Sequence, residues 1–210
     1  MRIHTLPAGP IETNGYLLVD EARREAVLID APHDVWKEVE LGLLAARARL
    51  VALLLTHGHW DHTGDAALIQ KRGVPIYAHE DDRVLIETPE VMEMFGMPGL
   101  EMPPARIDRL VAQQQVLELG GQRIEVRHVP GHCRGNVLFH FPALTAAFVG
   151  DALFAGSIGR TDLPGGDFDQ LAHSIRTQIF ILPANTIVYP GHGPETSVGE
   201  EMATNPYVPG

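Results

Sequence analysis

The sequence predicts an α/β fold in a single domain. A β-α-β pattern occupies the middle of the chain, and the second half is again rich in strands before its helix. In addition, histidine or aspartate follows the ends of several apolar runs. Functional residues of open α/β sheets gather at the carboxyl ends of strands, so this third observation agrees with the first two. A chain of 210 residues is long enough to bury one large core.

The first half of the chain predicts alternating strands and helices. Two apolar runs with a charged turn between them predict a hairpin, and an amphipathic stretch predicts a helix. A continuous apolar run predicts a strand that is buried on both faces, and a further helix and strand complete a β-α-β unit. In order, these are strands at 15–19 and 26–30, a helix at 35–49, a strand at 51–55, a helix at 64–72 and a strand at 75–78.

Residues 88–104 interrupt this pattern. The segment contains four prolines and four methionines and has no clear period. It is interpreted as a loop or a short broken helix, which either fills a gap in the core or covers a substrate pocket as a lid.

The second half predicts another set of strands followed by a helix. The expected strands are at 116–119, 123–129, 137–141 and 146–149, followed by a helix at 169–180 and a final buried strand at 186–189. Each half therefore places its strands before a helix, as two stacked half-sheets would.

Charge and cysteine content exclude several classes of function. With 16 basic and 27 acidic residues, the net charge is −11, which disfavours nucleic acid and anionic membranes as partners. No apolar stretch reaches the length of a signal core or a membrane span, so a cytoplasmic location is expected. The single cysteine, Cys133, rules out an internal disulfide and a cysteine-only zinc site. We expect Cys133 to be a small buried thiol rather than a redox or metal-binding group.

The strongest functional signal is Thr-His-Gly-His-Trp-Asp-His at residues 56–62, directly after the predicted buried strand. In extended backbone, His57 and His59 project to the same side, and Gly58 lets the chain turn tightly enough for both to reach one ion. Asp61 and His62 then face a neighbouring point. Imidazole together with carboxylate suits zinc or another borderline divalent ion.

Three further strand ends repeat the pattern of apolar run, glycine and metal-binding residue. The glycine allows the backbone to approach a crowded site closely. Each motif is weak alone, but together with residues 56–62 they complete two coordination shells. The three residues are His132 in Val-Pro-Gly-His, Asp151 in Phe-Val-Gly-Asp and His192 in Val-Tyr-Pro-Gly-His.

These motifs, in this order and over nearly the whole length, resemble the metallo-β-lactamase superfamily and, within it, glyoxalase II, the hydroxyacylglutathione hydrolases. Residues 150–166, and 189–196 with Asn205-Pro206, resemble the short bacterial glyoxalase II-like hydrolases. The resemblance implies an αββα sandwich with a dinuclear site at one edge of the sheets. It implies His57, His59 and His132 as ligands of the first metal, Asp61, His62 and His192 as ligands of the second, and Asp151 as the bridging carboxylate.

The candidate substrate contacts are two arginines. Full-length glyoxalase II enzymes bind glutathione through basic residues of a C-terminal helical region, and this chain ends shortly after Asn205-Pro206. The resemblance therefore supports hydrolysis more firmly than glutathione as the carrier. Arg134 and Arg160 lie next to metal-ligand motifs and are candidates to bind a substrate carboxylate. Asp162 follows Arg160 closely, which equally predicts a structural ion pair.

The predicted reaction is hydrolysis of a thioester such as an S-2-hydroxyacylglutathione. Two divalent ions would share a water at Asp151 and lower the pKa of that water from about 15.7 to about 7. Zinc is the expected metal, with iron or manganese as alternatives. The resulting hydroxide would be the nucleophile, oriented by Asp61. A thiol with a pKa of about 8.5 leaves without proton assistance, whereas an amine does not.

Two other reactions fit the same motifs. Persulfide dioxygenases resemble this chain, including the stretch Gly-Arg-Thr-Asp at 159–162, and use one iron. Lactone or β-lactam hydrolysis is the second, because the pocket and not the nucleophile selects the substrate.

Overall fold

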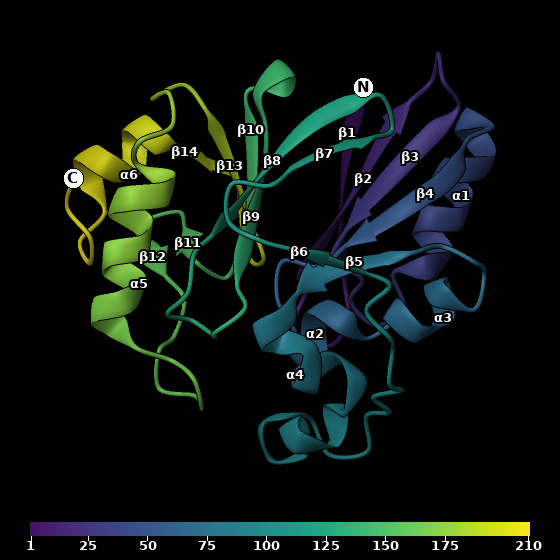
Figure 1. The fold of residues 1–210 in the computed structure, drawn as a ribbon, viewed down its shortest axis with the longest axis horizontal. Coiled ribbons are helices and arrows are strands. Elements are labelled where there is room, and N and C mark those ends of the chain that lie inside the picture. The colour runs from purple at the N-terminus through teal and green to yellow at the C-terminus, as the bar shows by residue number, and fades with distance from the viewer.

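Two six-stranded sheets lie face to face (Figure 1). The computed structural model describes residues 1–210, apart from the side chain of Glu93. The first sheet has the order β1 (Arg2–Ala8), β2 (Thr13–Asp20), β3 (Glu25–Ile29), β4 (Arg49–Leu54), β5 (Ile76–His79) and β6 (Arg109–Val111). The second has the order β14 (Thr196–Ser197), β13 (Ile187–Pro190), β10 (Ala146–Gly150), β9 (Val137–Phe141), β8 (Gln122–His128) and β7 (Val116–Leu119).

Helices cover the outer faces of both sheets (Figure 1). The first sheet is flanked by α1 (Trp36–Ala46) and α3 (Ala66–Gln70), and the second by α5 (Phe168–Ser174), its π-helical continuation Ile175–Ile179, and α6 (Val198–Thr204). The remaining short elements are α2 (Trp60–Thr63), α4 (Arg83–Glu87), 3-10 turns at Glu80–Asp82, Pro89–Phe95 and Pro142–Leu144, and the small hairpin of β11 (Leu153–Phe154) and β12 (Ser157–Ile158). The predicted αββα sandwich is confirmed.

Three apolar clusters fill the spaces between the four layers. In β2, Leu17 belongs to the cluster under α1, while Leu18 belongs to the cluster between the sheets. In β9, Phe139 faces the other sheet and Leu138 faces the outer helices. Successive side chains of a strand point to opposite faces, so a strand covered on both faces is apolar without interruption. This is why the central strands could be recognised from their sequence.

The strands bring four chain segments to one edge of the sandwich. β3 to β6 run parallel, as do β10 and β13, and β8 lies antiparallel to β9 and hence parallel to β10. Backbone hydrogen bonds join the two sheets at this edge, from Val137 to the Thr56 carbonyl at 2.8 Å and from Asn14 to the Gly191 carbonyl at 2.7 Å. The residues that follow β4, β8, β10 and β13 therefore meet there.

Several predicted boundaries were wrong. The helix predicted at 35–49 ends at Ala46, because Arg47 adopts a left-handed conformation with φ of 50° and the chain enters β4 two residues later. The helix predicted at 64–72 is restricted to 66–70 and is preceded by the separate helix α2. Strands β1, β6 and β14 and helix α6 were not predicted. No helix among the described residues has the length and apolar character needed to cross a membrane.

Candidate metal centre

All seven residues predicted as metal ligands come together at the edge where the sheets meet. Six of them are buried, and His192 is partly exposed. The local elements explain the arrangement: one loop follows β4 and leads into α2, and single residues follow β8, β10 and β13. Three sets of these residues have ligand atoms within 4.8 Å of one another. The first group is His57, His59 and His132, and the second group is Asp61, His62 and His192. The remaining set, His57 with His62 and Asp151, shares one histidine with each group.

The first group is a set of converging imidazoles. His59 Nδ1 and His132 Nε2 are 2.9 Å apart. The His57 ring is edge-on to both, with ring centroids at 4.7 Å from His59 and 5.0 Å from His132. A tetrahedral zinc ion with Zn–N bonds of about 2.0–2.1 Å separates its nitrogens by about 3.3 Å. The three histidines therefore suit one ion.

Asp151 connects the first group to the second. Its Oδ2 lies 3.7 Å from His132 Nε2 and 3.5 Å from His192 Nε2, while its Oδ1 lies 3.2 Å from His62 Nε2. In the second group, Asp61 Oδ2 is 3.1 Å from His192 Nε2 and 3.3 Å from His62 Nε2. One carboxylate thus contacts histidines of both groups, which is the position of a bridging ligand.

Hydrogen bonds outside the centre orient three of the histidines. In each, Nδ1–H donates to an oxygen, so Nε2 keeps its lone pair and faces the centre. The acceptors are Thr56 Oγ1 for His57 at 3.1 Å, Asp30 Oδ2 for His62 at 2.8 Å and the Arg160 carbonyl for His132 at 2.8 Å.

Unpaired buried atoms show that these residues fit a metal. His57 Nε2, His62 Nε2 and Asp151 Oδ1 are buried, and none has a hydrogen-bond partner within the described part of the chain. A buried polar atom without a partner costs roughly 1–3 kcal/mol. Three such atoms directed at one another are explained by divalent cations that accept their lone pairs.

The electrostatics of His57, His59 and Asp61 favour the forms that bind metals. Burial and the neighbouring His132 lower the pKa of His59 to about 3, and burial with His62 and His59 lowers the pKa of His57 well below its usual range. Although burial acts in the opposite direction, His62 and a hydrogen bond with His192 hold the pKa of Asp61 well below its usual range. Neutral imidazole and ionised carboxylate are the ligating forms.

The negative potential of the site also shows at His62. Burial would lower the pKa of His62, but Asp61, Asp151 and Asp30 raise it well above its usual range. Three carboxylates around one buried imidazole attract positive charge. A divalent cation beside His62 Nε2 would be stabilised by the negative charge of these carboxylates.

Close backbone approach explains the glycines of the ligand motifs. A Cβ on Gly191 would lie 2.0 Å from Asp151 Oδ1 and 2.6 Å from His62 Cε1. A Cβ on Gly150 would lie 2.4 Å from Thr56 Oγ1, and Gly150 has φ of +56°. Both positions exclude a side chain, as their place before the metal-binding residues predicted.

Sequence reasoning missed the residues that support the ligands. Asp30 directly follows β3 and accepts hydrogen bonds from Thr56 N at 2.8 Å and Thr56 Oγ1 at 2.7 Å, besides the one from His62. An apolar strand followed by aspartate shares part of the pattern that marked Asp151, without its glycine, so a partial signal for Asp30 was present. Thr13 Oγ1 donates to Asp61 Oδ2 at 2.8 Å across 48 residues, and no spacing pattern indicates that contact.

The two candidate arginines are placed differently. The Arg160 guanidinium donates two hydrogen bonds to Asp162, both at 2.8 Å, which is the ion pair that their spacing predicted. Arg134 is exposed and lines a pocket of about 310 Å³ beside the centre. Cys133 lies in the wall of the same pocket, is 1% exposed and donates to Asp82 Oδ2 at 3.2 Å. Burial raises the pKa of the Cys133 thiol, which agrees with the prediction of a small buried thiol.

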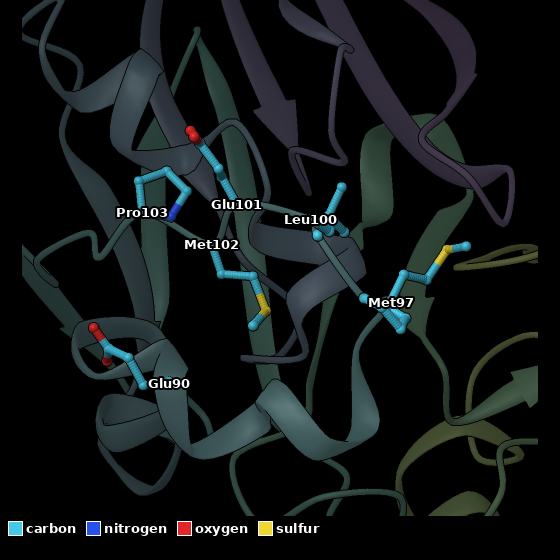
Figure 2. A pocket seen from close by; sticks show the side chains of 8 residues that line it. Glu90, Met97, Leu100, Glu101, Met102 and Pro103 are labelled. Carbon is cyan, nitrogen blue, oxygen red and sulfur yellow. The ribbon is translucent and has the colours of Figure 1, made fainter.

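Two other features do not belong to the centre. Glu90 and residues 97–103, within the Met/Pro-rich segment, form a hollow of about 510 Å³ that contains none of the seven predicted ligands. Figure 2 shows the side chains that line it. His79, Asp81 and His128 also have ligand atoms within 4.8 Å of one another. The rings of His79 and His128, however, are stacked at 4.2 Å and 14°, so their in-plane lone pairs do not converge on one ion.

Comparison with known proteins identifies relatives over nearly the whole chain. The sequence model of the metallo-beta-lactamase superfamily matches residues 8–192. The hydroxyacylglutathione hydrolase GloC of Haemophilus influenzae is 36% identical, with 99% of this chain and 98% of the relative covered. A probable metallo-hydrolase of Bacillus subtilis, YqgX, is 31% identical, with 100% and 99% covered.

Solved structures give the same result. The B3 metallo-beta-lactamase BLEG-1 is 36% identical with a TM-score of 0.91, and each chain is covered fully. TTHA1623, solved in a di-iron-bound form, is 36% identical with a TM-score of 0.84, with 97% of this chain and 99% of that chain covered. ETHE1 from Myxococcus xanthus is 28% identical with a TM-score of 0.81, with 99% and 84% covered. The chain belongs to the metallo-beta-lactamase superfamily of metallo-hydrolases.

Proposed function

We propose that this protein hydrolyses a thioester of the S-2-hydroxyacylglutathione type at a pair of divalent metal ions. The observation that carries the proposal is the position of Asp151, whose two oxygens contact histidines of both groups. The similarity to GloC over both whole chains supports the substrate class, and the di-iron form of TTHA1623 supports two ions. Zinc is the expected metal by ligand type, with iron or manganese as alternatives.

The protein's own residues would orient and confine the reaction. When bound, the two ions would polarise the substrate carbonyl and acidify a water. Thr13 Oγ1 donates to Oδ2 of Asp61, and the His62 and His192 nitrogens that would hold the second ion lie beside the same oxygen, which leaves Oδ1 to accept a hydrogen bond from the attacking water and orient it. The leaving thiol has a pKa of about 8.5 and departs as thiolate without a general acid.

The pocket beside the centre is the candidate site for the rest of the substrate. Apolar side chains of α4 and of the 3-10 turn Pro89–Phe95 form one side, and Arg134 and Gly165 form part of another. Val84 and Val91 are 56% and 46% exposed there. We propose that the Met/Pro-rich segment 88–104 closes over bound substrate as a lid and that Arg134 binds a substrate carboxylate.

Replacing Arg134 with glutamine is expected to raise the KM for a carboxylate-bearing thioester about tenfold with little change in kcat, because a charge-assisted hydrogen bond contributes roughly 1.5 kcal/mol. Steady-state kinetics would measure this. Arg160→Gln is the matched control, because Asp162 already holds that guanidinium. A larger rise in KM for Arg160→Gln than for Arg134→Gln would contradict the assignment of the substrate contact to Arg134.

Metal analysis combined with activity tests the proposed function. We expect about two divalent ions per chain, hydrolysis of S-lactoylglutathione, and loss of turnover on adding a chelator. Full turnover in chelated protein would exclude a metal-dependent reaction. One iron per chain, with oxygen uptake on glutathione persulfide and no hydrolysis, would assign the protein to the dioxygenases.

β-Lactam hydrolysis is the second candidate function. It is favoured by the similarity to BLEG-1 across the full length of both chains. An amide nitrogen must be protonated as it leaves, whereas a thiolate need not be. A cephalosporin assayed beside S-lactoylglutathione distinguishes the two, and we expect the higher kcat/KM for the thioester.

A further inference from the structure

A buried carboxylate outside the ligand set joins the two loops that form the first metal position. Asp82 is 1% exposed and ends the 3-10 turn between β5 and α4. Its Oδ2 accepts hydrogen bonds from Gly58 N at 2.8 Å and Cys133 Sγ at 3.2 Å, and its Oδ1 accepts one from Gly135 N at 2.7 Å. Both of its oxygens are therefore used within the protein.

The donors belong to the loops that carry three of the predicted ligands. Gly58 lies between His57 and His59, in the loop after β4 of the first sheet. Cys133 and Gly135 follow His132, in the loop after β8 of the second sheet. Asp82 thus connects the two sheets at the point where their imidazoles converge, and His59 Nδ1 and His132 Nε2 lie 2.9 Å apart across that junction.

Close packing around Asp82 supports a specific role for it. A Cβ on Gly135 would lie 2.5 Å from Asp82 Cγ, and a Cβ on Gly58 would lie 3.2 Å from Asp82 Cβ. Both amide donors are therefore at glycines that allow the backbone to reach the carboxylate. Hydrogen bonds to an ionised acceptor are stronger than neutral ones and hold their donors in a narrower geometry.

We propose that Asp82 is a positioning residue for the first metal position, holding the loop of His57 and His59 and the loop of His132 at the spacing that one ion requires. The inference rests on the proposed metal centre. Groups that orient metal ligands typically change metal affinity by about 10–100-fold when removed. The second position, formed by Asp61, His62 and His192, is held by Asp30 and Thr13, and none of its three residues donates a hydrogen bond to Asp82.

Cobalt(II) titration of the chelator-treated full-length protein, followed by absorption, tests this. The wild-type protein is expected to bind cobalt in two steps. A His192→Ala variant keeps all three imidazoles of the first position, so the step that it retains is assigned to that position. Asp82→Ala should raise the Kd of the first step about 10–100-fold and leave the second unchanged. Asp82→Asn should have an intermediate effect, because one acceptor oxygen remains. Asp81→Asn is the matched control, an exposed neighbour with the same loss of charge, and should bind as wild type.

Gly135→Ala is an independent variant. It keeps the buried Asp82 carboxylate, but the added Cβ displaces that carboxylate from its position, so the variant remains informative where Asp82→Ala does not fold. It should weaken the first step selectively. Unchanged affinity of the first step in both Asp82 variants would overturn the inference. Equal weakening of both steps together with a lower Tm would overturn it as well, because that is a general loss of structure. Wild type that binds no cobalt would overturn the metal centre itself.

Discussion

Replacing Asp151 with asparagine is expected to lower kcat for thioester hydrolysis by about 10³-fold, or roughly 4 kcal/mol of transition-state stabilisation. Asp151 contacts His62 through Oδ1 and both His132 and His192 through Oδ2. An amide keeps the shape but loses the negative charge that two cations would share. We therefore also expect the metal content, measured by elemental analysis, to fall from about two ions per chain to one or fewer.

Asp151→Glu tests whether geometry matters as well as charge. Gly191 lies so close that a Cβ there would be 2.0 Å from Asp151 Oδ1. A carboxylate on a longer side chain cannot occupy this space, so glutamate should not restore activity. Asp162→Asn, at an exposed carboxylate, is the control for surface charge and should retain nearly full activity. Near-wild-type kcat in Asp151→Asn with two ions still bound would contradict the bridging role.

The meeting of the seven candidate metal ligands could be predicted because their signals are local. His57, His59, Asp61 and His62 lie within six residues, and His132, Asp151 and His192 each follow an apolar strand and a glycine. Parallel strands bring such ends to one edge, so local pattern was sufficient to predict their meeting. The central strands were equally clear, because both of their faces are covered and their sequences are apolar throughout.

Of the supporting residues, Asp82 could not be predicted because its contacts are distant in sequence. Asp82 bonds to Gly58, 24 residues earlier, and to Gly135, 53 residues later. Short edge elements were missed for a different reason. β6 is only three residues long, with two of them exposed, and such a segment has too few buried positions to show a period.

Replacing Asp30 with alanine is expected to lower the free energy of unfolding by about 3 kcal/mol and to weaken the second metal position about 10–100-fold. Asp30 is 1% exposed and accepts from Thr56 N, Thr56 Oγ1 and His62 Nδ1, so alanine leaves three buried donors unpaired. Urea unfolding and metal titration measure the two effects.

Asp30→Asn is the matched variant, because asparagine tolerates the left-handed backbone (φ of 55°) and keeps one acceptor, so it should lose less stability. Equal stability of Asp30→Ala and wild type would show that the unpaired donors find water, and the imidazole of His62 would then be oriented by the metal alone.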